Sequence, residues 1–303
     1  MLRTLRSRVL LGFLIVLITA AGIFREEIVF NVRLMNVVRQ GNAYYADYSF
    51  LTKNIAYGTK PHQLLDVYRP DDNEQHPVVI YIHGGGWNSG NKELYALVAQ
   101  KLVPLGMVVV VPAYQLYPDA TYLSMVSDVA AAIAWTRSHI ADYQGDPARI
   151  IVGGQSAGAQ LSAMAFLDPA TAPALAGSPS VCGYFGISGV YDIDEQVAFE
   201  VSHGRTAPVM TAVMGGPTNF GSRSPGQQNL TGFPQTLIIH GDADDTVDIG
   251  MSKRFVDALK SSSVPVTFNS YPGRGHSELL FHALTESPGR LIADVTAFAD
   301  ACP

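Results

Sequence analysis

Short apolar runs alternate along residues 64–301 with longer runs whose apolar side chains recur every three or four residues. Short runs without polar alternation are typical of parallel strands buried on both faces, and the longer spacing is that of one helix face. The predicted strands are 64–68, 77–82, 107–111, 149–152, 184–190, 236–239 and 266–271, and the predicted helices are 93–105, 124–139, 160–167, 249–259 and 290–301.

This order of elements predicts an α/β fold with a mostly parallel central sheet and helices on both faces. Residues 64–68 are expected to form an edge strand. Residues 192–232 interrupt the alternation and become rich in Gly, Pro and Ser toward their end. Insertions of this kind often form lids or walls of substrate sites. No boundary divides the body, so residues 51–303 are predicted to form one domain with a small lid-like insertion.

The most apolar run lies near the beginning of the chain, at residues 9–24, and follows Arg3, Arg6 and Arg8. It is shorter than the roughly 20 residues of a typical membrane span, and a cleaved signal peptide is the alternative. We favour an uncleaved membrane anchor over residues 1–24. Either interpretation places the body on the external, periplasmic or lumenal side, because positive charge stays in the cytoplasm. Residues 25–50 have the spacing of an amphipathic helix, on the membrane or capping the domain.

Composition and charge narrow the function classes. Hydrophobic residues make up 48% of the chain and charged residues 15%, against roughly a quarter charged in an average globular protein. This apolar content excludes a disordered chain. The formal net charge is −6, and no basic run follows the N-terminal arginines. An acidic body of this kind predicts no nucleic-acid partner, because such binding depends on clustered basic residues.

The sequence holds no fingerprint of a metal or a nucleotide cofactor, so none is predicted. Cys182 and Cys302 form no CxxC motif, which argues against a zinc cluster or a dithiol redox site. The sequence leaves their pairing open, with two free thiols favoured over one disulfide. The acidic run at 242–248 has the composition of a cation site. Its place directly after a strand favours another role, that of the acid in a catalytic triad.

Residues 154–158 read GQSAG and match the G-x-S-x-G pattern. They follow a predicted strand and precede a predicted helix, which is the context of a nucleophile elbow. In such a turn the nucleophile, here Ser156, has a strained backbone, and its hydroxyl is lifted above the sheet. The residues two before and two after it must be small so that neighbouring backbones can pass, which fits Gly154 and Gly158.

A second glycine-rich loop, HGGGW at residues 83–87, also follows a predicted strand. Attack on a carbonyl creates an oxyanion that needs preorganised donors, and glycines let backbone N–H groups approach it closely. The expected oxyanion hole is formed by the amides of Gly85, Gly86 and Ala157. His83 is interpreted as a support of this turn rather than as a base.

A nucleophilic serine needs a base, and the base needs an acid that orients it. After the strand at 236–239, the loop carries several aspartates, of which Asp244 is the preferred acid. Asp242 is interpreted as a loop-stabilising acid and Asp248 as a helix N-cap. His276 follows the last predicted strand in a glycine-rich loop and is the preferred base, whereas His282 is expected to be a packed surface histidine.

Together these motifs resemble the α/β-hydrolase superfamily, and most closely esterases of the hormone-sensitive-lipase and carboxylesterase type. Residues 145–160 and 191–203 are similar to prenylcysteine methylesterases. The resemblance implies an α/β-hydrolase fold and a serine carboxylic ester hydrolase that acts on small-molecule esters through an acyl-enzyme. Gln155 and Ala159 depart from the usual GDSAGG, which leaves the acyl preference open. Amide or peptide hydrolysis and a non-catalytic binding module are the alternatives, and the oligomeric state stays undetermined.

Overall fold

The computed structural model describes residues 32, 35–36, 38–175, 181–285 and 289–302. Its contacts divide the chain into two units, residues 1–40 and residues 41–303. In the first unit the described residues are helical. The predicted anchor at 1–24 lies outside the described residues. None of the helices that the structure describes is long and apolar enough to cross a membrane.

An eight-stranded sheet forms the centre of the second unit, in the order β1-β2-β4-β3-β5-β6-β7-β8. β1 pairs antiparallel with β2 and β2 with β4, whereas all other neighbours are parallel. The strands are β1 (Leu51–Ala56), β2 (Leu64–Tyr68), β3 (His76–Ile82), β4 (Val108–Pro112), β5 (Gly145–Gln155), β6 (Gly183–Ile187), β7 (Gln235–Gly241) and β8 (Val266–Tyr271).

β2 is not the edge strand that the sequence predicts, because β1 pairs with its outer side. Every residue of β2 except the first is buried, whereas most residues of β1 are exposed. The exposed strand carries polar side chains at several positions, so its sequence lacks the apolar run by which the other strands were identified.

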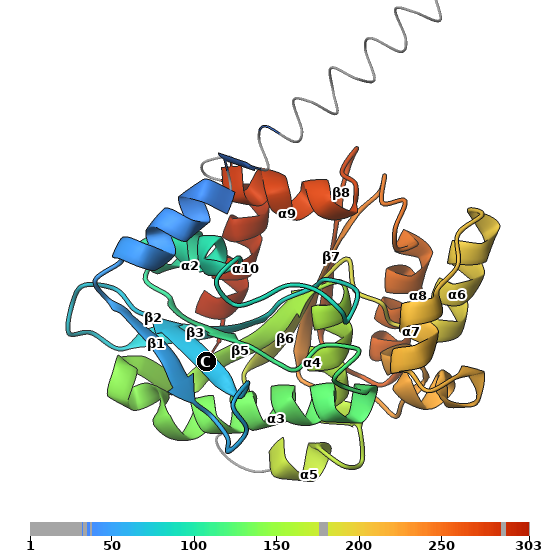
Figure 1. The fold of residues 1–303 in the computed structure, drawn as a ribbon, viewed down its shortest axis with the longest axis horizontal. Helices are drawn as coiled ribbons and strands as arrows, with labels where there is room; N and C mark the ends of the chain where they lie inside the picture. The colour runs from blue at the N-terminus through green and yellow to red at the C-terminus, as the bar shows by residue number, and fades with distance from the viewer. Residues whose placement is uncertain (1–31, 33–34, 37, 176–180, 286–288, 303) are drawn as a thin grey trace, which may run out of the picture. The chain divides into compact units, whose positions relative to one another are not determined.

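Helices cover both faces of the sheet, as the sequence predicts (Figure 1). α2, α9 and α10 pack against one another on one face, and α3, α4 and α8 cover the other. The helices are α2 (Ala96–Leu102), α3 (Tyr122–His139), α4 (Ala157–Leu167), α5 (Ala172–Leu175), α6 (Ile193–Ser202), α7 (Pro208–Val213), α8 (Ile249–Ser261), α9 (His276–Thr285) and α10 (Arg290–Asp300).

The segment 192–232 is built of short helices and turns. It forms α6, α7 and three 3-10 turns at Pro217–Asn219, Gly221–Arg223 and Pro225–Gln227. The α6 helix begins at a side-chain cap, where the Asp192 carboxylate accepts a hydrogen bond from the backbone N–H of Glu195 at 3.0 Å. Two acidic residues in the first turn further stabilise this helix end.

Cys182 and Cys302 form a disulfide, so the favoured prediction of two free thiols is wrong. The two residues are 120 positions apart, with their Cα atoms separated by 5.7 Å. α10 brings them together, because it packs across β6 so closely that a Cβ on Gly183 would lie 2.6 Å from the Phe298 ring. This proximity depends on the fold and has no signature in the spacing of the two cysteines.

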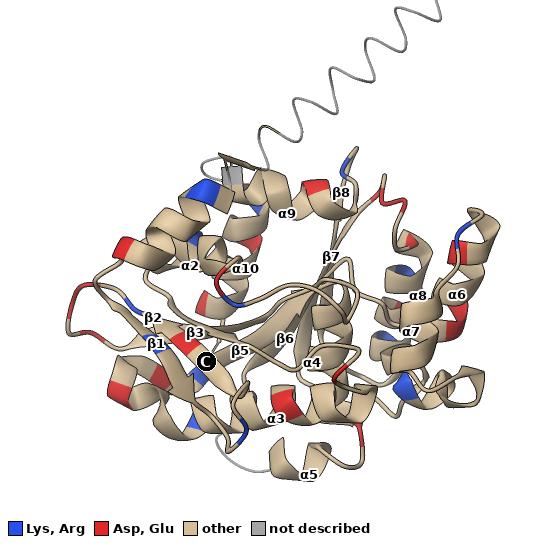
Figure 2. Ribbon diagram, viewed as in Figure 1, with Lys and Arg blue, Asp and Glu red and all other residues tan. Residues whose placement is uncertain are grey.

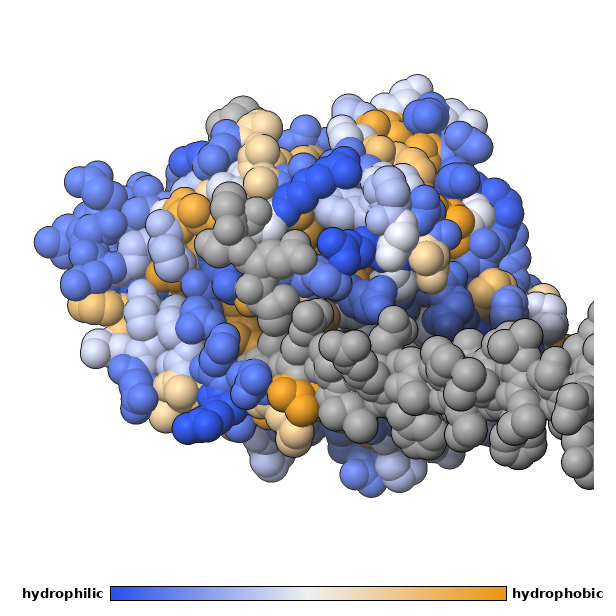
Figure 3. All heavy atoms as spheres, turned by 90° about the horizontal axis from the view of Figure 1, so that it is seen from above, coloured by the Kyte–Doolittle hydropathy of each residue, from blue (hydrophilic) through white to orange (hydrophobic). Residues whose placement is uncertain are grey.

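Part of the apolar excess of the sequence lies in the core. β4, β6 and β7 carry no Asp, Glu, Lys or Arg, and the charged side chains lie on helices, other strands and loops (Figure 2). On the face drawn in Figure 3, the apolar residues among those described are scattered between hydrophilic ones. The buried strands therefore account for much of the deficit of charge.

Candidate active site

Ser156 lies at the turn between β5 and α4, with φ 57° and ψ −124°. This positive φ is strained for a residue other than glycine. The turn is held by a hydrogen bond from the backbone N–H of Ser156 to the oxygen of Ile187, at 2.9 Å. A Cβ on Gly154 or on Gly158 would lie 2.0 or 2.2 Å from the oxygen of Ile82. The two flanking glycines are therefore required by the close passage of β3, as the sequence predicts.

Asp244 and His276 are in direct contact. Nδ1 of His276 lies 2.8 Å from Oδ2 of Asp244, although the two residues are 32 positions apart. Asp244 follows β7, and His276 is the first residue of α9, in a segment that the sequence predicts to be a loop. Because β7 and β8 are parallel neighbours, their carboxyl ends bring the two residues to the same edge of the sheet.

The Asp244 carboxylate is surrounded by donors. Its side chain is buried, and Oδ1 accepts hydrogen bonds from the backbone N–H groups of Thr246 and Val247, both at 2.9 Å. Burial would raise the pKa of this carboxyl, but the hydrogen bonds from His240 and His276 outweigh it and hold the pKa well below its ordinary value. Asp244 is therefore ionised and suited to orient an imidazole.

His240 is a further member of this cluster and is not among the predicted site residues. Its Nε2 lies 3.2 Å from Oδ2 of Asp244, and its Nδ1 lies 2.7 Å from the hydroxyl of Ser252. The side chain is fully buried below the acid loop, so it supports Asp244 from within the core. Its position at the end of a buried strand, four residues before the acid, is the signal that identifies it.

The loop after β3 contains Gly85 and Gly86. Their φ angles of 123° and 59° lie in the region that favours glycine. Both glycines line the same pocket as Ser156. Ala157 is the first residue of α4, where a helix leaves its N–H groups without acceptors inside the helix. Gly85 and Gly86 therefore share a pocket with Ser156, and Ala157 is its neighbour in the chain, while their role as oxyanion donors stays a prediction.

His83 supports this loop from within the core. Its ring stacks on Tyr114 and Tyr95, with centroids 4.4 and 5.5 Å apart, and its Nδ1 lies 2.9 Å from the oxygen of Gly84. Burial lowers the pKa of His83 to about 4, so the ring is neutral at pH 7. This environment suits a support of the turn and is unlike that of a solvent-accessible base.

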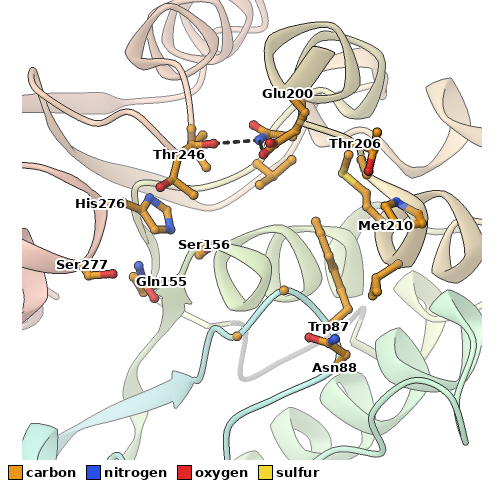
Figure 4. Close-up of a pocket in the computed structure, with 18 of the residues that line it drawn as sticks. Trp87, Asn88, Gln155, Ser156, Glu200, Thr206, Met210, Thr246, His276 and Ser277 are labelled. Atoms are coloured by element: carbon orange, nitrogen blue, oxygen red, sulfur yellow. Dashed lines mark hydrogen bonds between the residues drawn. The ribbon is translucent and has the colours of Figure 1, made fainter. Parts of the chain in front are cut away.

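Ser156 and His276 line one pocket of about 490 Å³, and Figure 4 shows the His276 ring beside the serine. Trp87 forms one wall, and its indole Nε1 donates to Oε1 of Gln160 at 3.1 Å. Another wall comes from the 192–232 insertion, with Gln196, Glu200, Thr206, Ala207, Pro208, Val209 and Met210. The insertion therefore forms a wall of the candidate substrate site.

Two other predicted residues have the roles that the sequence assigns. Oδ1 of Asp242 accepts a hydrogen bond from the N–H of Gly273 at 2.6 Å and so stabilises the loop. Asp248 caps α8 by accepting from the N–H of Gly250. His282 is half-buried in α9. Within the described part of the chain, no cluster of His, Cys, Asp and Glu is suited to hold a metal ion.

Comparison with known proteins finds one matching family and several similar esterases. The model of the BD-FAE family matches residues 65–259. An isoprenylcysteine alpha-carbonyl methylesterase of Arabidopsis thaliana is 31% identical over 75% of this chain. Esterase LipC of Mycobacterium tuberculosis is 32% identical over 80% of it. The chain spans 56% and 63% of the lengths of these two relatives.

Solved structures share the fold at lower identity. A carbohydrate esterase from gut microbiota superposes with a TM-score of 0.68 at 24% identity, over 84% of this chain and 96% of its own. Esterase B from Lactobacillus Rhamnosis superposes with a TM-score of 0.71 at 19% identity, over 89% of this chain and 96% of its own. These similarities establish the α/β-hydrolase fold.

Proposed function

The chain belongs to the BD-FAE family, and from that premise we propose that it is a serine carboxylic ester hydrolase. The observation that carries the proposal is the contact of Asp244 with His276, whose ring lies beside Ser156 at a strained elbow. A serine, a base and an acid that orients the base are the groups that nucleophilic acyl transfer requires. The esterase names of its relatives support the same reaction class.

The proposed reaction proceeds through an acyl-enzyme. His276 takes the proton of the Ser156 hydroxyl as its oxygen attacks the ester carbonyl. The amides of Gly85, Gly86 and Ala157 stabilise the oxyanion. His276 then gives the proton to the leaving alcohol as the carbonyl–alkoxy bond breaks. Water repeats the sequence on the acyl-enzyme, releasing the carboxylic acid and restoring the serine.

Replacing the nucleophile tests this proposal. Ser156→Ala is expected to lower kcat for 4-nitrophenyl acetate by roughly 10⁴-fold, because the covalent step is lost. Ser277→Ala is the matched control, since Ser277 lines the same pocket but lies outside the proposed triad. Its activity should stay close to that of the wild type. Retention of most activity in the Ser156 variant would refute the assignment.

The location of the enzyme is a further part of the proposal. The arginines before the apolar run at 9–24 support an anchor that places the catalytic body on the external, periplasmic or lumenal side. Carbonate washing of membranes that carry the full-length chain tests the anchor. The chain should stay in the pellet, and its release would contradict the proposal.

A further inference from the structure

A second pair of histidine and aspartate side chains lies outside the pocket. Oδ2 of Asp128 on α3 lies 2.9 Å from Nε2 of His62, and Oδ1 accepts a hydrogen bond from Nε2 of Gln63 at 2.8 Å. Asp128 is fully buried, and none of these three residues lines the pocket that holds Ser156. Burying a carboxyl group is costly unless donors surround it, so a cluster of this kind calls for an explanation.

The same carboxyl group also holds a segment of backbone. Oδ2 of Asp128 accepts a hydrogen bond from the backbone N–H of Gln115 at 3.2 Å. Gln115 belongs to the loop 113–118, which leaves the carboxyl end of β4. At the start of this loop, the backbone oxygen of Ala113 accepts from the hydroxyl of Tyr57 at 2.6 Å. The loop is therefore held from two sides, by α3 and by the residue that follows β1.

This loop in turn holds both ends of the glycine-rich HGGGW loop. At the first end, the hydroxyl of Tyr114 donates to the backbone oxygen of His83 at 2.9 Å, and the two rings stack. At the second end, the backbone N–H of Tyr117 donates to the backbone oxygen of Trp87 at 3.0 Å. The two glycines of the proposed oxyanion hole lie between these attachment points.

We propose that Asp128 is a positioning residue of the active site and acts on the proposed oxyanion hole through the loop 113–118. Gly85 and Gly86 have positive φ angles and belong to no helix or strand, so the fixed ends of their loop determine where their N–H groups point. Oxyanion donors stabilise the transition state only when they are held in place before the reaction. The inference rests on the proposed ester hydrolysis and adds to it a residue that supports the oxyanion hole.

Asp128→Asn tests the inference without changing the size of the buried side chain. Both carboxyl oxygens face N–H groups, so the amide nitrogen of asparagine would oppose a donor in either orientation. Deleting an oxyanion donor costs roughly 10²–10³-fold, and displacing one should cost less. We expect kcat/KM for 4-nitrophenyl acetate to fall by about tenfold, counted per serine that reacts with diethyl 4-nitrophenyl phosphate. Asp128→Ala, which removes the acceptor altogether, should lower it further.

Two ketone inhibitors distinguish positioning from a general effect on the fold. The serine hydroxyl adds to 1,1,1-trifluoro-4-phenylbutan-2-one and creates a negatively charged oxygen, whereas 4-phenylbutan-2-one binds without this addition. The inhibition constant of the trifluoromethyl ketone should rise about tenfold in Asp128→Asn, in parallel with the loss in kcat/KM, because both depend on the oxyanion hole. The inhibition constant of the methyl ketone should change by less than about twofold.

Asp168→Asn is the matched control. Asp168 is also buried, and its carboxyl oxygens accept hydrogen bonds from the hydroxyl of Tyr122 at 3.1 Å and from the backbone N–H of Ala170 at 2.9 Å. Both partners lie outside the loops 83–87 and 113–118. The kcat/KM of this variant and its two inhibition constants should stay close to those of the wild type.

The outcomes separate the inference from the function on which it rests. If the wild-type enzyme hydrolyses the ester and Asp128→Asn keeps its kcat/KM, ester hydrolysis stands and the inference is wrong. The inference is equally wrong if both ketones weaken by the same factor, or if Asp168→Asn shows the same losses, because Asp128 then supports the fold alone. If the wild type neither hydrolyses 4-nitrophenyl acetate nor reacts with the phosphate triester, the proposed function fails and the inference fails with it.

Discussion

Three histidines differ at the scale of single residues because their surroundings differ. His276 faces the pocket, His240 is buried beneath the same carboxylate, and His83 is stacked between aromatic rings. Two of them can be identified from the sequence. His276 follows from the Ser…Asp…His order and its glycine-rich loop, and His83 from the glycine-rich loop that it begins. His240 is missed because its role depends on partners that only the fold supplies, such as Ser252.

The burial of His83 predicts how stability depends on pH. Its pKa falls from 6.5 in the unfolded chain to about 4 in the folded protein, so the unfolded state binds more protons between these values. This contribution to stability is complete above pH 6.5 and is lost as the pH falls toward 4. Between pH 7 and pH 5 the free energy of unfolding should decrease by about 2 kcal/mol on this account.

Denaturant titrations at several pH values measure this effect. His83→Phe keeps an aromatic ring between Tyr95 and Tyr114 and removes the titrating group. Its free energy of unfolding should therefore fall less between pH 7 and pH 5 than that of the wild type. His139→Phe on the exposed end of α3 controls for the loss of a histidine. Parallel curves for wild type and His83→Phe would contradict the prediction.

At the scale of elements, the geometry of the candidate site depends on how closely β3 passes the turn between β5 and α4. Buried strands and the helices after them are predictable, because each carries a continuous apolar pattern. The exposed β1 lacks that pattern, and α9 follows a glycine-rich turn whose composition is typical of a loop. The pairing of β1 with β2 therefore emerges only from the structure.

Gly158→Ala tests the close passage of β3. Alanine normally favours a helix by about 1 kcal/mol over glycine. Here its Cβ would lie 2.2 Å from the oxygen of Ile82 and 2.5 Å from that of His83, both of them backbone atoms. We therefore expect the free energy of unfolding to decrease by about 3 kcal/mol.

Gly204→Ala provides the comparison for this substitution. Gly204 has a φ of 69°, but no atom lies within 4 Å of the position that a Cβ would take, so alanine there adds strain without collision. Gly204→Ala should therefore lower the free energy of unfolding by about 1 kcal/mol. Chemical denaturation measures both variants, and an equal or smaller loss in Gly158→Ala would show that the elbow has room to relax.

At the scale of the whole molecule, one covalent bond joins Cys182, the residue before β6, to Cys302 at the end of the described chain. The parallel strands place Ser156 at their carboxyl ends, whereas Cys182 precedes the amino end of β6. The disulfide therefore lies at the amino ends of the parallel strands, and the candidate site lies at their carboxyl ends. The overall architecture follows from the sequence pattern, but this long-range bond does not.

Removing the disulfide should lower stability and leave catalysis intact. The double variant Cys182→Ser/Cys302→Ser frees a long loop in the unfolded chain, which destabilises the fold by about 2–5 kcal/mol. Its kcat/KM on 4-nitrophenyl acetate at low temperature should stay close to that of the wild type. Denaturation with and without dithiothreitol is the measurement. An unchanged midpoint for the reduced wild type would argue against the bond.

The wall of the pocket is held by hydrogen bonds to the loop that contains Asp244, the proposed acid. Gln196 donates to the oxygen of Thr246, and Arg205 donates to that of Asp245, the two residues that follow Asp244. Variation in α6 therefore alters substrate contacts and the support of the acid together. This coupling limits evolvability: a lineage or a directed-evolution library that reshapes the wall must preserve both tethers or reconstruct the loop at the same time.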